Sequence, residues 1–163
     1  MDGALWYFAY GSNLDPRTFL GRRSMRPLAT RCGLLRDFEL CFDLPVGAGE
    51  RGVANVRPRA GAHVWGVAYR LAPAEFDRLD RTEGVHRGAY SRRAVELALP
   101  GGGELRAFTY CSAHSQPHRK PSRRYLGLLL AGARHHGLPP EWIEQLRAWP
   151  LAIDERASQG ELF

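Results

Sequence analysis

The chain has 163 residues and a formal net charge of +6, with 44% hydrophobic and 25% charged residues. This length suits one domain with one sizeable core, and this balance of residue types excludes wholesale disorder. No apolar run approaches the roughly 20 residues that a membrane-spanning helix needs, so the sequence predicts no membrane partner.

The first predicted elements are a strand, a glycine loop and a helix start. Residues Leu5 to Tyr10 (LWYFAY) are aromatic and apolar without polar alternation, which is typical of a strand buried on both faces. Gly11-Ser12-Asn13 ends this strand, and Asp15-Pro16 follows as a predicted N-cap with proline at the first helical position. Backbone N–H groups in such a loop can hold a carboxylate or an oxyanion. The plainer alternative is a tight turn in which Ser12 and Asn13 satisfy the local backbone.

Glycine-rich turns separate the strands predicted next, at Gly33 to Phe42, Gly52 to Arg57 and His63 to Leu71. PAEFDRLDRT (Pro73 to Thr82) predicts a helix that Gly84 ends.

The second half predicts a hairpin, a loop and two helices. The strands Tyr90 to Leu99 and Glu104 to Cys111 flank PGGG, and Ser112 to Arg124 is polar and proline-interrupted. The helices are expected at Tyr125 to His136 and Pro140 to Trp149.

Six strands and four helices without strict alternation indicate the α+β class, with a mostly antiparallel sheet or small barrel surrounded by helices. We expect one domain over residues 1–163, with a core at about 5–150 and a loosely ordered tail at 154–163.

Glu83 lies at the predicted end of a helix, in LDRTEGV. The dipole at a helix C-terminus opposes a negative charge and raises the pKa of a carboxyl group, which would suit a general base in a partly buried place. A solvated glutamate at a frayed helix end is the alternative. Asp80 could pair with Glu83, but a salt bridge from Asp80 to Arg78 or Arg81 is the plainer expectation.

The cysteines and the N-terminus indicate a reducing compartment. Cys32, Cys41 and Cys111 are an odd number with no Cys-x-x-Cys pair, which predicts buried thiols rather than a metal site. The start carries no basic region before its short apolar run, so we expect no secretory signal and a cytoplasmic location.

Four blocks in order resemble the γ-glutamylcyclotransferase-like family, whose fold is also called AIG2-like or BtrG-like. They are LWYFAYGSNL, VWGVAYRL, LDRTEGVHRGAY, and PSRRY followed by a helix and GLPPEW. The resemblance covers about residues 5–149 and implies a β-barrel core surrounded by α-helices. It also implies an enzyme that cyclises a γ-glutamyl group, whose α-amine attacks its own γ-carbonyl to release 5-oxoproline and an amine or amino acid.

The resemblance assigns roles to particular residues. Glu83 would be the acid/base, and the loop Tyr10-Gly11-Ser12-Asn13-Leu14 would bind the substrate through its backbone N–H groups. Tyr90 and Tyr125 match positions that line the family's pocket. Intramolecular attack requires no protein nucleophile, metal or cofactor. The expected partner is a small γ-glutamyl compound, and related enzymes are often dimers, which suggests a homodimer.

Two other functions compete with this interpretation. Arginines such as Arg22-Arg23 and Arg123-Arg124 could form a basic face for nucleic acid, but the cations are scattered and no binding motif is present. Binding of DNA would weaken steeply with salt and survive Glu83→Gln. An inactive family member that only binds a γ-glutamyl ligand is the other alternative, and the presence of Glu83 argues against it.

Overall fold

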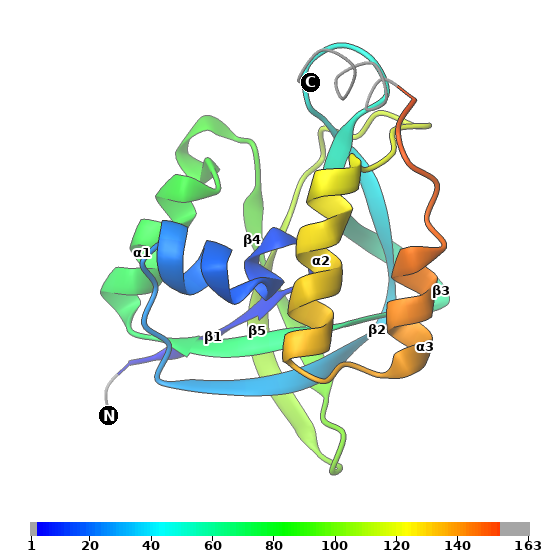
Figure 1. Ribbon diagram of the computed structural model, residues 1–163. Coiled ribbons are helices and arrows are strands. Elements are labelled where there is room, and N and C mark those ends of the chain that lie inside the picture. The colour runs from blue at the N-terminus through cyan, green and yellow to red at the C-terminus, as the bar shows by residue number, and fades with distance from the viewer. Residues whose placement is uncertain (1–2, 154–163) are drawn as a thin grey trace.

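The computed structural model describes residues 3–153, which fold around a closed five-stranded barrel (Figure 1). The strand order is β1-β3-β2-β4-β5, and β1 closes the barrel against β5. Every neighbouring pair is antiparallel except β1 and β5. The predicted α+β fold with a mixed, mostly antiparallel small barrel is therefore confirmed. The strands are β1 (Leu5–Ala9), β2 (Ala29–Pro45), β3 (Gly52–Leu71), β4 (Ser91–Ala98) and β5 (Glu104–Cys111).

The long β2–β3 hairpin differs from the prediction of separate strands at Gly52 to Arg57 and His63 to Leu71. Both belong to β3, and the register passes from Arg36 opposite His63 to Phe38 opposite Pro58, so residues 59–62 bulge out against a single residue. That residue, Asp37, accepts a hydrogen bond from the Gly61 N–H at 3.0 Å. Gly61 has a φ of 83°, so its glycine signal marks a bulge and not a chain reversal.

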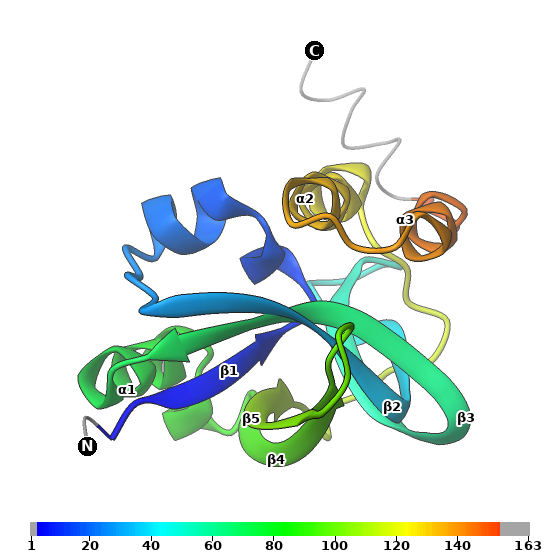
Figure 2. The ribbon, with the colours of Figure 1, turned by 90° about the horizontal axis from the view of Figure 1, so that it is seen from below.

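Helices cover two sides of the barrel (Figure 2). The helix α1 (Pro73–Thr82) lies on one side, and α2 (Arg123–His135) and α3 (Pro140–Arg147) lie together on another. Three short elements complete the fold: the 3₁₀ turns η1 (Ser12–Leu14) and η3 (Val85–Arg87), and the π-helix η2 (Arg17–Arg22). The predicted start of a helix at Asp15 is confirmed, because the Thr18 N–H donates to Asp15 Oδ2 at 3.2 Å.

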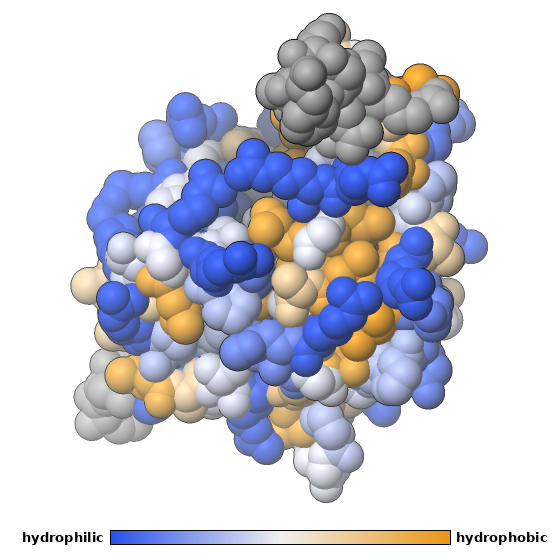
Figure 3. All heavy atoms as spheres, in the orientation of Figure 1, coloured by the Kyte–Doolittle hydropathy of each residue, from blue (hydrophilic) through white to orange (hydrophobic). Residues whose placement is uncertain are grey.

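The helix α2 packs against η1 at Gly132. A Cβ added there would lie 2.3 Å from the carbonyl carbon of Leu14, whose side chain is fully buried. Only glycine therefore allows α2 to pack directly on the backbone of η1. On the face seen in Figure 3, hydrophobic residues gather over α2 and hydrophilic residues surround them.

Other expectations concern the loop and the ends of the chain. Between β5 and α2 the described chain forms no helix or strand, apart from an isolated bridge between Arg51 and Lys120. The tail predicted to be loosely ordered, 154–163, lies outside the described residues. None of the helices within residues 3–153 combines the length and the apolar character needed to cross a membrane.

Candidate active site

A cavity of about 240 Å³ opens where β1 ends and η1 begins. Its walls come from β1, η1, the start of β3, β5, the end of α1 and the first turn of α2. Seven of the eight site residues expected from the sequence line it, and Leu14 does not. The lining residues are Tyr7, Tyr10, Gly11, Ser12, Asn13, Arg23, Val53, Ala54, Glu83, Tyr90, Tyr110 and Tyr125.

Glu83 directly follows the last helical residue of α1, and Gly84, with a φ of 72°, turns the chain away. Its side chain is only 14% exposed. Oε1 accepts a hydrogen bond from Asn13 Nδ2 at 3.0 Å and lies 3.9 Å from a guanidinium nitrogen of Arg23. Burial raises the pKa of Glu83, and the Arg23 charge and the Asn13 hydrogen bond oppose this rise. The direction agrees with the sequence expectation, and burial is its largest cause.

Asn13 connects the loop to this carboxylate. Its Nδ2 donates to both Glu83 and the hydroxyl of Tyr7, the latter at 2.9 Å, while Oδ1 accepts from Arg23 Nε at 2.6 Å. Its backbone carbonyl accepts a hydrogen bond from Tyr69. Asn13 is 3% exposed. Its side-chain amide fits in only one orientation, because the NH2 group must face the Glu83 carboxylate and the oxygen must face the Arg23 guanidinium. One oxygen of Glu83 is therefore held, while Oε2 has no hydrogen bond within residues 3–153.

The loop offers fewer free N–H groups than the sequence predicts. The Leu14 N–H donates to the Gly11 carbonyl at 3.0 Å, and the Leu14 side chain packs beneath α2. The N–H groups of Gly11, Ser12 and Asn13 donate to no backbone carbonyl in the described chain. Leu14 thus shapes the loop, and the three residues before it border the cavity.

The two tyrosines expected from the resemblance are held by the backbone of one residue. Tyr90 donates its hydroxyl hydrogen to the Ala54 carbonyl at 2.8 Å, and the Ala54 N–H donates to the Tyr125 hydroxyl at 3.0 Å. Burial raises the pKa of Tyr125 to about 12, and it raises the pKa of Tyr90 as well. Both phenols are therefore neutral at physiological pH. Ser12 hydrogen-bonds to the Tyr125 hydroxyl through both its backbone N–H and its side chain.

Sequence reasoning missed three polar residues of this cavity: Tyr7, Arg23 and Tyr110. Tyr7 and Tyr110 were missed because the sequence alone does not distinguish an aromatic site residue in a strand from an aromatic residue of the hydrophobic core. In the sequence Arg23 entered only the competing interpretation of a basic face for nucleic acid, and its contact with Asn13, ten residues earlier, reveals its position. The sequence around Arg23 carried no signal that could have separated it from the neighbouring Arg22.

The expected salt bridge from Asp80 to Arg78 or Arg81 is wrong. Asp80 Oδ1 accepts instead from Arg92 Nε at 2.8 Å and from the Tyr110 hydroxyl at 2.6 Å. Arg92 lies on β4, so this partner comes from packing across the fold and not from helix spacing. Asp80 is thereby tied to the barrel wall.

Comparisons with known proteins agree with this geometry. Residues 63–146 match the model of the AIG2-like family. Mouse gamma-glutamylcyclotransferase is 35% identical over 87% of this chain and 77% of its own length, and the human protein of that name is 34% identical over the same shares. This chain belongs to the AIG2-like family, among the gamma-glutamylcyclotransferases. A solved gamma-glutamyl cyclotransferase structure aligns with a TM-score of 0.82 at 29% identity, covering 91% of this chain and 89% of that one.

The predicted family, fold and enzyme class are thus confirmed for this gamma-glutamylcyclotransferase-like chain. The comparisons name no residue, so the roles of Glu83 and of the loop do not follow from them. Within residues 3–153, no three His, Cys, Asp or Glu side chains gather as a metal site would require. All three cysteines are free thiols.

Proposed function

We propose that this cavity cyclises γ-glutamyl compounds to 5-oxoproline, with Glu83 as the single acid/base. The observation that carries the proposal is the state of the Glu83 carboxylate. It is largely buried, one oxygen is held by Asn13, and the other is left for the substrate. A carboxylate with a raised pKa takes and returns protons more readily near neutral pH than an exposed one.

The proton balance of the reaction fits one such group. The substrate's α-ammonium gives a proton to Glu83, and the freed amine attacks the γ-carbonyl carbon, forming the ring C–N bond. The attacking nitrogen then loses a second proton, the amide nitrogen of the leaving group gains one, and the amide C–N bond breaks. No proton is taken up or released overall when the leaving amine ends as an ammonium. A single carboxyl group that shuttles protons between two nitrogens is therefore sufficient.

The loop supplies donors for the negative groups of the substrate. The N–H groups of Gly11 and Asn13 lie beside the cavity and suit either the α-carboxylate or the oxyanion of the tetrahedral intermediate, whereas the Ser12 N–H is engaged with the Tyr125 hydroxyl. Tyr10, Tyr90 and Tyr125 line the remaining wall as neutral phenols. They position the folded substrate without adding a charge that would compete with Glu83. Intramolecular attack needs mainly this restriction of the substrate's conformation.

The test is release of 5-oxoproline from a panel of γ-glutamyl amino acids and amines. Glu83→Gln and Glu83→Ala should lower kcat/KM by about 10²- to 10⁴-fold, which is the usual contribution of a positioned acid/base. Glu144→Gln is the matched control, because Glu144 lies exposed on α3, paired with Arg147. Wild-type turnover by Glu83→Gln would contradict the role of Glu83. No 5-oxoproline from any compound would contradict the proposed activity.

The partner in this proposal is a small γ-glutamyl molecule, with no nucleic acid and no membrane. The cytoplasmic location and the homodimer stay predictions. Cell fractionation and sedimentation of the purified protein would test them.

A further inference from the structure

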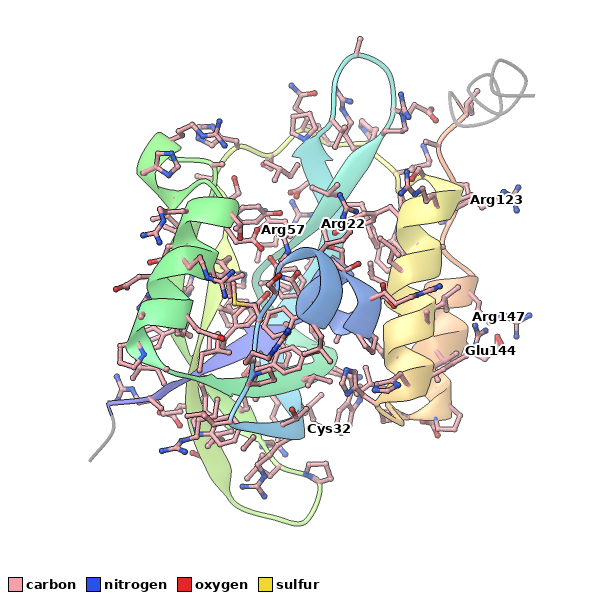
Figure 4. The ribbon with its side chains drawn as sticks, turned by 60° about the vertical axis from the view of Figure 1, so that its left-hand side comes forward. Arg22, Cys32, Arg57, Arg123, Glu144 and Arg147 are labelled. Atoms are coloured by element: carbon pink, nitrogen blue, oxygen red, sulfur yellow. The ribbon has the colours of Figure 1, made fainter. Side chains whose placement is uncertain are left out.

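A second hollow, of about 480 Å³, adjoins the candidate active site. The two share Ser12, Arg23 and Tyr125, so these side chains form the border between them. The hollow lies between η2, α1 and α2. Its other lining residues are Thr18, Arg22, Ser24, Arg78, Thr82 and Leu128. Figure 4 shows Arg22 at the end of η2, between α1 and α2.

Three guanidinium groups and no carboxylate line this hollow. Arg78 is held in place, since it donates to the carbonyl of Arg23 at 2.8 Å and to that of Ser24 at 3.0 Å. Arg23 is engaged with Asn13 and Glu83. Arg22 is exposed and has neither an ion pair nor a side-chain hydrogen bond within residues 3–153. Its charge is therefore uncompensated at the wall of a basic hollow.

The hydroxyl groups of the wall are already used by the protein. Thr18 donates to Asp15, Thr82 to the carbonyl of Leu79, and Ser24 to that of Gly21. A ligand in the hollow therefore interacts mainly with the positively charged guanidinium groups, because these hydroxyl groups are already hydrogen-bonded within the protein. Positive potential with fixed donors selects for anions, and arginine in particular for carboxylates.

We propose that this hollow binds the leaving group and that Arg22 selects leaving groups with negative charge, above all acidic amino acids. The inference rests on the proposed function. The γ-glutamyl part fills the first cavity against Glu83, so the substituent on its amide nitrogen must pass the border at Ser12 and Tyr125. An acidic leaving amino acid places its α-carboxylate and its side-chain carboxylate among Arg22 and Arg78. A γ-glutamyl amine has no group for these cations.

A series of substrates with increasing negative charge on the leaving group tests this proposal. γ-Glutamyl ethylamide, γ-glutamyl alanine and γ-glutamyl glutamate carry zero, one and two carboxylates on the leaving side. In the wild type, kcat/KM should rise along the series by about three- to tenfold per carboxylate, as expected for partly exposed charge-assisted contacts. This preference should weaken as ionic strength increases.

Substitutions then test whether Arg22 causes this preference for negatively charged leaving groups. Arg22→Gln should remove most of the rise along the series and leave the ethylamide within about twofold of wild type, and Arg22→Glu should reverse the order. Arg123→Gln is the matched control, because Figure 4 shows Arg123 pointing outward from the far side of α2. That variant should keep the wild-type order.

Two results would overturn the proposal. An equal loss on all three substrates in Arg22→Gln would place Arg22 against the glutamyl part instead. A flat wild-type series would mean that the hollow does not recognise charge. Both results require 5-oxoproline to be formed, so they differ from failure of the proposed function, in which no substrate yields it.

Discussion

Asn13 should set the pKa of Glu83, and Asn13→Asp tests this with almost no change of shape. The substitution replaces the Nδ2 donor by a carboxylate oxygen. Two carboxylate oxygens would then face each other at about the 3.0 Å that now separates Asn13 Nδ2 from Glu83 Oε1. At an effective dielectric constant of ~20, two like charges at this distance repel by about 5 kcal/mol. That repulsion alone corresponds to a rise of about 4 units in the pKa of the pair.

Arg23 reduces this effect, because its Nε lies 2.6 Å from Asn13 Oδ1 and its charge would neutralise part of the new carboxylate. We therefore expect the acid limb of the pH profile of kcat/KM to move up by about 1–3 units, as for other carboxylates beside a like charge. The assay is release of 5-oxoproline from one γ-glutamyl amino acid between pH 5 and pH 9. Asn13→Ala removes the donor without adding charge and should move the limb less.

The pH dependence of stability provides a second measurement of the effect of Asn13→Asp on the pKa of Glu83. The folded pKa of Glu83 is already raised, so its contribution to stability is fully present below about pH 4.3 and is lost as pH rises through the folded pKa. Asn13→Asp raises that pKa further and should destabilise the protein more at pH 8 than at pH 5 in urea unfolding. An active variant whose acid limb stays at the wild-type position would refute the role given to Asn13.

Two further predictions concern the parts that support the site. Tyr125→Phe leaves the Ala54 N–H without its acceptor and should lower the free energy of unfolding by about 1–3 kcal/mol; unchanged stability in urea would show that this N–H finds another partner. Gly132→Ala forces a Cβ to within 2.3 Å of the Leu14 backbone, so it should cost about 1–3 kcal/mol and raise KM. Gly127→Ala is the control on the same helix. Its added Cβ meets nothing within 4 Å, so it should stabilise by roughly 0.5–1 kcal/mol, and equal effects of the two substitutions would contradict the packing explanation.

Local signals in the sequence predicted the ends of elements well. Asp15-Pro16 begins a helix, Pro73 opens α1, and Gly84 ends it in a left-handed conformation, because each signal depends only on the few residues around it. The glycine at position 61 misled the strand prediction. Whether such a glycine makes a turn or a bulge depends on the partner strand, here on Asp37, which local sequence does not reveal.

Non-local contacts account for the other errors and omissions. Arg92 reaches Asp80 across the fold, and Arg23, which directly follows the π-helix η2, reaches Asn13 ten residues earlier. Tyr7 could not be told from a core residue, since its ring packs against Phe19 and Phe76 like any buried aromatic side chain. Only its hydroxyl group, which accepts from Asn13, makes it part of the site.

The meeting of Asn13 and Glu83, 70 residues apart, follows from the connectivity of the barrel. Leu5 at the start of β1 pairs with Leu71 at the end of β3, and α1 begins two residues later. From this shared edge, the ten residues of α1 rise about 15 Å at 1.5 Å each. The chain from Leu5 to Tyr10 advances about 17 Å at roughly 3.3 Å per residue. A helix and a strand of matched length, starting at the same edge, therefore bring the catalytic carboxylate we propose beside the loop that holds it.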